Sequence, residues 1–335
     1  MNHNTPITPR PLPLASRTGR TQRLVSAAQL RNQGVPAGEV AARCRPGGGW
    51  QQLLPGVFLL QPGPPTSEDR LNAALLYARR AGAVPPQGPE AMITGLAALT
   101  LHRFSSAPPL TALDRIDVLV PRTRRLRSTG WVRVVRAAEH PEPVELTGVP
   151  VAPAARAVAD AVAGLSDAET VRRLLTEAVR GGHCEPTAIV RELSRARLLA
   201  RPHVVDAVDT LLVEGRSLSE ERLYEMVREF GLPDPLWNVD LRLPGGPHLG
   251  GVDAYWPDQA VAVELDTRAP RQDDDALWSE YTRKREHLER LGITVVHLTP
   301  RKLREALDQQ ATVVRTALMA APDRQPSAYV VVLPR

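Results

Sequence analysis

Three acidic residues, Asp253, Glu264 and Asp266, stand close together in an otherwise apolar part of the sequence. Side chains alternate between the two faces of a strand. In VAVELD (261–266) the acids are therefore predicted to project from one face and the apolar residues from the other. Asp253 belongs to the preceding predicted strand, GVDAYW, and a tight turn at residues 257–258 would make the two strands antiparallel neighbours. Asp253 is then expected to approach Glu264.

Carboxylates that are buried together on two apolar strands lower the stability of the fold unless a nearby positive charge compensates them. Oxygen ligands suit Mg²⁺ or Mn²⁺, which polarise a phosphodiester and help to ionise an attacking water. The sequence therefore predicts a metal site formed by Asp253, Glu264 and Asp266, with Glu220 as a further catalytic acid. A simpler alternative is that the acids form ordinary ion pairs with nearby arginines, namely Arg268, Arg283 and Arg285.

The elements that position these acids are read from hydrophobic periodicity and from turn residues. The predicted order is a helix at 219–230, strands at 237–243, 250–255 and 261–266, a helix at 277–291, a strand at 293–298 and a helix at 300–319. This αβββαβ order occupies a domain predicted at 216–320, followed by a tail at 321–335. The acidic run 273–275 is expected to be a solvated loop before a helix, where negative charge is favourable.

At these residues the chain resembles the PD-(D/E)xK nuclease superfamily, and within it the compact domains similar to very-short-patch-repair (Vsr) endonucleases. The resemblance covers about residues 216–300 and implies a restriction-endonuclease-like core. By position, Asp253 and Glu264 match the metal-binding pair of that family. Glu220, in RSLSEERL, matches the acid on its first helix.

The sequence departs from this family where the catalytic lysine is expected, because Asp266 stands there. Related Vsr-like domains often continue with Gly and a nearby His, whereas this chain has Thr267, Arg268 and no histidine before His287. Lys284, on the following predicted helix, is the candidate for the missing positive charge. An inactive nuclease-like fold used only for binding remains an alternative, since a fold does not fix a function.

The N-terminal part is predicted to be a small DNA-binding domain. A flexible lead-in, 1–18, precedes two short helical patterns separated at Gly34 and resumed after Pro36, and then a β-ribbon within 50–60. Helix, turn, helix and ribbon form a winged helix-turn-helix at 19–62. In such units the second helix enters the major groove of DNA, and arginines contact the phosphates. The candidate DNA-binding residues here are therefore Arg31, Arg43 and Arg45.

The segments SAAQLRNQGV and WQQLLPGVFLL resemble the N-terminal domain of abortive-infection (AbiEi-like) type IV antitoxins and related transcriptional regulators. A weaker resemblance extends to about residue 165 and implies an antitoxin-like middle region. The alternative for the N-terminal motif is a small protein-interaction domain.

The middle region, 63–214, is predicted to be mixed and mostly helical, with helices at 66–82, 93–101, 152–163, 167–181 and 187–213 and strands at 115–120 and 131–135. The run PRTRRLRSTGWVRVVR, which follows the first strand and includes the second, carries six arginines and no acid over 120–136. Arg122, Arg124 and Arg125 are candidates for nucleic-acid backbone contacts, and a solvated hairpin is the alternative. A domain boundary is predicted near Gly215, where a helix is expected to end.

Charge is distributed unevenly along the chain of 335 residues. Residues 1–60 carry seven arginines and one acid, a net +6, whereas residues 216–300 carry ten bases and sixteen acids, a net −6. A basic and an acidic end suggest different roles. Two cysteines without metal-ligand spacing, no signal sequence and no membrane-length apolar stretch favour a cytoplasmic protein with no membrane partner.

Together these features predict an α/β (α+β) protein whose partner is DNA. The first hypothesis is a metal-dependent endonuclease-like protein capable of phosphodiester hydrolysis. The second is a non-catalytic transcriptional regulator or type IV antitoxin-like repressor, with a toxin as a further partner. A signalling or scaffold protein without nucleic acid is the third. The sequence leaves the oligomeric state open.

Overall fold

The computed structural model describes residues 23–79, 91–266, 275–320 and 329–335. These residues form a mixed α/β protein with eleven α-helices and three β-sheets. Contacts divide the chain into two compact units, which we call unit 1 (residues 1–93 and 114–150) and unit 2 (residues 94–113 and 151–335). Within the described ranges, no helix is both long and apolar enough to cross a bilayer.

Unit 1 begins with two short helices and a small sheet. The elements are β1 (Leu24–Ser26), α1 (Ala27–Asn32), α2 (Ala37–Arg43), β2 (Gln51–Leu54) and β3 (Val57–Leu59), with sheet order β1-β3-β2. The helical pattern predicted before Gly34, which covers RLVSAAQLRNQGV, is wrong at its start, because Leu24–Ser26 pair with β3 as a strand. The hydroxyl of Ser26 then caps α1, and Gln29 completes a reciprocal capping box.

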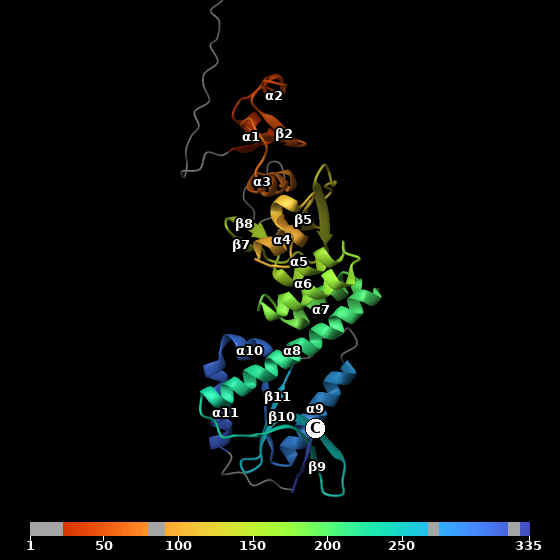
Figure 1. Ribbon diagram of the computed structural model, residues 1–335, viewed down its shortest axis with the longest axis vertical. Coiled ribbons are helices and arrows are strands. Elements are labelled where there is room, and N and C mark those ends of the chain that lie inside the picture. The colour runs from red at the N-terminus through yellow and green to blue at the C-terminus, as the bar shows by residue number, and fades with distance from the viewer. Residues whose placement is uncertain (1–22, 80–90, 267–274, 321–328) are drawn as a thin grey trace, which may run out of the picture. The chain divides into compact units, whose positions relative to one another are not determined.

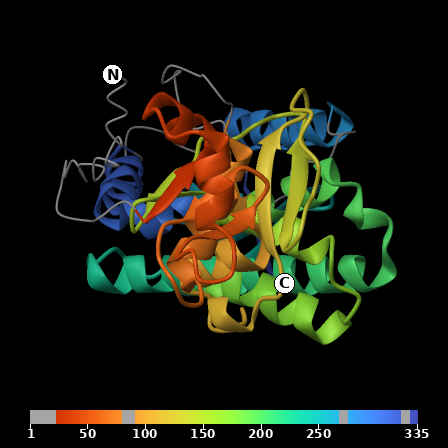
Figure 2. The same ribbon diagram turned by 90° about the horizontal axis from the view of Figure 1, so that it is seen from above.

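The rest of unit 1 contains a helix and most of a larger sheet. These elements are α3 (Ser67–Ala78), β4 (Met92–Thr94), β5 (Ile116–Pro121), β6 (Val132–Ala137), β7 (Val144–Leu146) and β8 (Val149–Val151), with sheet order β6-β5-β4-β8-β7. Strands β5 and β6 are parallel and lie side by side (Figure 2). The hairpin interpretation of the arginine-rich run is therefore wrong, and residues 122–131 are a crossover loop. Strands β7 and β8 were not predicted from the sequence.

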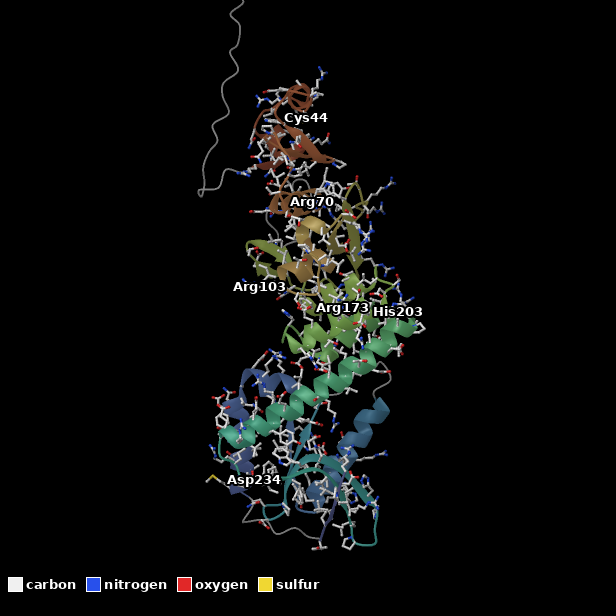
Figure 3. The ribbon with its side chains drawn as sticks, viewed as in Figure 1. Cys44, Arg70, Arg103, Arg173, His203 and Asp234 are labelled. Atoms are coloured by element: carbon white, nitrogen blue, oxygen red, sulfur yellow. The ribbon has the colours of Figure 1, made fainter. Side chains whose placement is uncertain are left out.

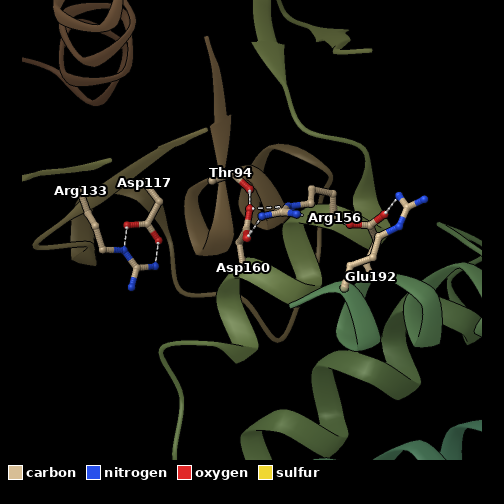
Figure 4. A network of polar contacts seen from close by, with 7 residues as sticks. Thr94, Asp117, Arg133, Arg156, Asp160 and Glu192 are labelled. Carbon is tan, nitrogen blue, oxygen red and sulfur yellow. Dashed lines mark hydrogen bonds and ion pairs between the residues drawn. The ribbon is translucent and has the colours of Figure 1, made fainter. Parts of the chain in front are cut away.

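Five helices make up the first part of unit 2: α4 (Gly95–Leu101), α5 (Ala154–Val162), α6 (Ala168–Arg180), α7 (Pro186–Arg195) and α8 (Pro202–Glu229). The predicted helix at 93–101 thus begins two residues later, after β4. A buried carboxylate, Asp160, accepts hydrogen bonds from the Thr94 hydroxyl at 2.6 Å and from Arg156 at 2.6 and 3.0 Å (Figure 4). This bonding satisfies a charge that would otherwise be costly inside the fold.

The helix break predicted at Gly215 is wrong, because α8 runs through it without interruption. The predicted helix at 187–213 ends instead at Arg195, and a new helix begins at Pro202. Gly215 is buried, and a Cβ atom placed on it would overlap Cγ of Pro186 on α7. Glycine at this position therefore allows close approach of two helices.

We expect Gly215→Ala to lower the free energy of unfolding by about 1–3 kcal/mol, because the added methyl group has no room against Pro186. Helix propensity alone predicts the opposite sign, since alanine is the better helix former. Ser217→Ala, at an exposed position of the same helix, is the matched control and should leave stability within about 0.5 kcal/mol. Urea unfolding of the three proteins measures both effects. A stabilised Gly215→Ala protein would contradict the packing argument.

The second part of unit 2 is a five-stranded sheet with helices on both faces. Its elements are β9 (Leu236–Arg242), β10 (His248–Trp256), β11 (Val261–Leu265), α9 (Asp275–Arg290), β12 (Thr294–Leu298), α10 (Pro300–Glu305), α11 (Leu307–Met319) and β13 (Val331–Pro334). The sheet order is β12-β11-β10-β9-β13, with β11 and β12 parallel and the other pairs antiparallel.

Two details of this region differ from the sequence prediction. The single helix expected at 300–319 is broken at Ala306, whose backbone is non-helical. The segment expected to be a C-terminal tail contains β13, which pairs with β9 and forms an edge of the sheet.

The two faces of this sheet have separate cores. Val261, Val263 and Leu265 of β11 pack with residues of α8, α10 and α11, whereas Ala262 packs on the opposite face with Leu288 of α9. Figure 1 shows α9 separated from α10 and α11 by the sheet strands. The predicted alternation of VAVEL is confirmed, and Glu264 lies on the face that α9 covers.

Candidate active site and nucleic-acid contacts

The structure brings Asp253 and Glu264 together across two neighbouring strands. The antiparallel register ends at Ala254 opposite Val263, the residues directly next to Asp253 and Glu264, and the charge of Glu264 acts on Asp253. The backbone N–H of Leu265 donates to Oδ2 of Asp253 at 2.7 Å, which fixes this alignment. Both acids are buried, with 7% and 4% of their surface exposed. The expected approach of the two acids is therefore present in the fold.

Asp253 is held by an arginine that the sequence analysis did not select. Nη2 of Arg216, on α8, donates to Oδ1 of Asp253 at 2.8 Å, and its Nε donates to Oε1 of Glu220 at 2.9 Å. Burial raises the pKa of Asp253, while the hydrogen bond from Leu265 and the charge of Arg216 act in the opposite direction. A sequence signal existed, because Arg216 and Glu220 are four residues apart and share a helix face.

Glu264 is ion-paired with Lys284 from α9. Nζ of Lys284 also donates to the backbone oxygen of Gly251 at 2.7 Å, so the ammonium group is held between β10 and β11. Oε1 of Glu264 is buried and accepts no hydrogen bond of ordinary geometry, although Nζ lies against it. The structure thus places Lys284 beside Glu264. Lys284 is the residue that the sequence suggested as the source of the positive charge missing at Asp266.

His297 is the other neighbour of Glu264 that sequence reasoning missed. Strand β12 is parallel to β11, and its register sets His297 opposite Glu264 with Nδ1 of His297 3.7 Å from Oε2 of Glu264. Burial lowers the pKa of His297, and the negative charge of Glu264 acts in the opposite direction. Only the parallel pairing of two strands with a helix between them brings these residues together, so local spacing could not reveal it.

The other residues noted in the sequence beside this pair are exposed or lie outside the described residues. Asp266 follows β11, is exposed, and donates its backbone N–H to Leu298 at 2.9 Å. His287 is exposed on α9, and Thr267 and Arg268 lie outside the described residues. Among the residues that are described, no three or more His, Cys, Asp or Glu side chains form a group placed to hold a metal ion. The pair formed by Asp253 and Glu264 is the part of the predicted metal set that the fold brings together.

This pair has the chemistry of a magnesium or manganese site. Mg²⁺ is commonly bound by one or two carboxylates and keeps several waters. Oε1 of Glu264 is buried and accepts no hydrogen bond of ordinary geometry, and its neighbour is the ammonium group of Lys284. Both acids nevertheless carry a counter-charge from the chain, Arg216 on one side and Lys284 on the other.

In unit 1, the arginines predicted at the helix-turn-helix have different surroundings. Arg31 and Arg45 are exposed. Arg43 pairs with Glu39 one turn earlier at 2.5 Å, and its guanidinium lies over the ring of Trp50 at 4.6 Å from the centroid. No residue of helix α2 is fully buried, and Val40 packs against the core formed by Val25, Leu30, Val35 and Phe58. Figure 3 labels Cys44, directly after this helix.

The arginines of the crossover loop and of β6 divide into a supporting set and an exposed set. Arg124 donates to the backbone oxygen of Ala78 at 3.1 Å, Arg136 donates to Arg124 and Leu126 oxygens, and Arg133 forms a two-bond ion pair with Asp117 (Figure 4). The Tyr77 hydroxyl donates to the Arg127 oxygen at 2.8 Å. Arg70, labelled in Figure 3, lies over the ring of Trp131 at 5.2 Å. The exposed set is Arg122, Arg125 and Arg127.

A comparison with known protein families finds no family that matches the chain. A comparison with curated proteins finds no match either.

Proposed function

We propose that this chain is a DNA-binding protein in which unit 2 carries a metal-dependent endonuclease-like site of the PD-(D/E)xK type and unit 1 carries a winged helix-turn-helix. The observation that supports the enzyme most directly is the grouping of Asp253, Glu264 and Lys284 on adjacent elements of one αβββαβ arrangement. Two buried acids beside one lysine are the residue types that hydrolysis of a phosphodiester requires.

In this proposal each side chain has a distinct task. Asp253 and Glu264 hold a Mg²⁺ or Mn²⁺ ion, which supplies Lewis-acid polarisation of the phosphodiester and a more acidic bound water. Lys284 keeps a positive charge beside Glu264, where it stabilises negative charge that develops on the phosphate. Glu220 and Asp266 lie at the margin and contribute negative charge that favours a cation.

The test is cleavage of supercoiled plasmid by the purified full chain with Mg²⁺ or Mn²⁺. We expect Asp253→Asn and Glu264→Gln each to lower the rate by about a hundredfold or more, because each removes a cation ligand. Asp258→Asn changes an exposed acid in the turn between the same two strands and should cut at the wild-type rate. Equal cleavage by wild type and both site variants, or no cleavage by any of them, overturns the enzyme.

One observation favours the non-catalytic alternative, a transcriptional regulator or antitoxin-like repressor that also contacts a toxin. Arg216 and Lys284 already neutralise Asp253 and Glu264, so the acids can be satisfied without any metal. A footprint on the promoter of its own operon that persists in Asp253→Asn and Glu264→Gln proteins, without cleavage, would support this alternative.

DNA binding itself is tested at the crossover loop. Because Arg122 and Arg125 are exposed, we expect the double variant Arg122→Ser/Arg125→Ser to reduce the slope of log affinity against log salt concentration by about 2, near 0.9 for each lost phosphate contact. Fluorescence anisotropy with a duplex of arbitrary sequence measures the slope. Arg290→Ser/Arg301→Ser removes the same charge from surface pairs of unit 2 and serves as the control. If both double variants reduce the slope equally, the change in salt dependence comes from net charge alone and not from contacts of the crossover loop.

A further inference from the structure

Arg216 occupies the position between two acids that a cation would take. It lies on α8 one turn before Glu220, and its guanidinium spans Glu220 at 2.9 Å and Asp253 at 2.8 Å. One arginine therefore joins an acid of the helix to an acid of the sheet. This arrangement places a positive charge beside Asp253, a ligand of the proposed metal site.

The burial of the two partners is unequal. The Asp253 side chain is 9% exposed, whereas that of Arg216 is 42% exposed. The carboxylate needs a nearby positive charge because it is desolvated, but the guanidinium can turn into solvent at little cost. A guanidinium and a divalent ion on the same carboxylate would repel each other strongly at such a short separation.

We infer that Arg216 is a built-in counter-cation that competes with the divalent cation for Asp253. When Arg216 turns away, Glu220 loses the same partner, so a second carboxylate becomes available beside Asp253. This inference rests on the proposed metal site. A DNA phosphate is the ligand best suited to draw the guanidinium away, since arginine binds phosphate through a two-bond fork. Cation and DNA binding then favour each other reciprocally.

The experiment measures Mn²⁺ binding by the full chain. Titration calorimetry gives the affinity, and the rise in melting temperature with Mn²⁺ concentration gives an independent measure of it. We expect Arg216→Gln to bind Mn²⁺ about tenfold or more tightly than wild type, because the competing charge is gone. Arg216→Lys, which keeps a charge but not the fork, should fall between them. Adding a non-cleavable duplex should tighten Mn²⁺ binding to wild type and leave Arg216→Gln nearly unchanged.

Two controls make the result specific. Arg222→Gln removes an exposed arginine of the same helix, paired with Glu225, and should bind Mn²⁺ like wild type. Asp253→Asn/Arg216→Gln should lose the gain because the ligand is missing. Circular dichroism shows whether Arg216→Gln is folded, and Arg216→Lys provides the comparison if it is not.

The outcomes separate the inference from the proposed function. Tighter Mn²⁺ binding by Arg216→Gln in a protein that never cuts DNA supports the inference and contradicts the enzyme. Equal or weaker Mn²⁺ binding by Arg216→Gln, or no binding by any variant, overturns the inference whether or not plasmid is cut.

Discussion

Replacing Lys284 by methionine is expected to lower the free energy of unfolding by about 3 kcal/mol, one of the largest effects of a single substitution in this chain. The reason is that the Glu264 side chain is 5% exposed and would lose its positive partner in a desolvated position. Gly251 would also lose a hydrogen bond to its backbone oxygen. Urea unfolding at neutral pH, followed by circular dichroism, measures this loss.

A double-mutant cycle separates the ion pair from simple packing. Glu264→Gln/Lys284→Met removes both charges and should recover much of the stability lost in Lys284→Met, because no uncompensated charge remains buried. Lys302→Met changes the only other lysine of the chain, which is exposed on α10, and should alter stability by less than about 0.5 kcal/mol. Additive effects of the two site substitutions would show that Lys284 and Glu264 are not coupled.

The sequence predicts the C-terminal sheet more closely than the rest because its signals are strong there. Apolar runs bounded by Pro, Gly and Asp place β9, β10, β11 and β12 within about two residues of their observed ends. Gly215 misled the prediction for a physical reason. Glycine often ends a helix, but here it provides space for Pro186, a tertiary contact that local sequence does not contain.

Part of the candidate site could likewise be predicted from the sequence, and part of it could not. The opposition of Asp253 and Glu264 follows from alternation and one short turn, both of which are local. Lys284 could be selected because lysine is rare in this chain, but its contact with Glu264 depends on how α9 packs. Arg216 and His297 reach the acids from a helix and from a parallel strand, so only the tertiary fold reveals them.

Gly250 is the residue whose replacement tests how Lys284 is positioned. Its φ is +118°, at a register irregularity between β9 and β10, and this backbone conformation strongly disfavours a side chain. A Cβ atom would also lie 2.9 Å from Cδ of Lys284 and overlap its Cε. We expect Gly250→Ala to lower the free energy of unfolding by about 2–4 kcal/mol, through backbone strain and through displacement of the lysine.

The control for backbone strain is Gly245→Ala, in the turn between the same strands. Gly245 has a φ of +62° and open space around its Cβ position, so its substitution carries strain without a clash and should cost about 1 kcal/mol. The excess cost of Gly250→Ala over Gly245→Ala then combines the less favourable backbone conformation at Gly250 with the contact to Lys284. In the Lys284→Met background this excess should shrink, because the methionine is not held by Glu264 and Gly251 and can move away from the new methyl group. An excess that is unchanged by Lys284→Met would assign the whole effect to the backbone and leave Lys284 positioned by α9 alone.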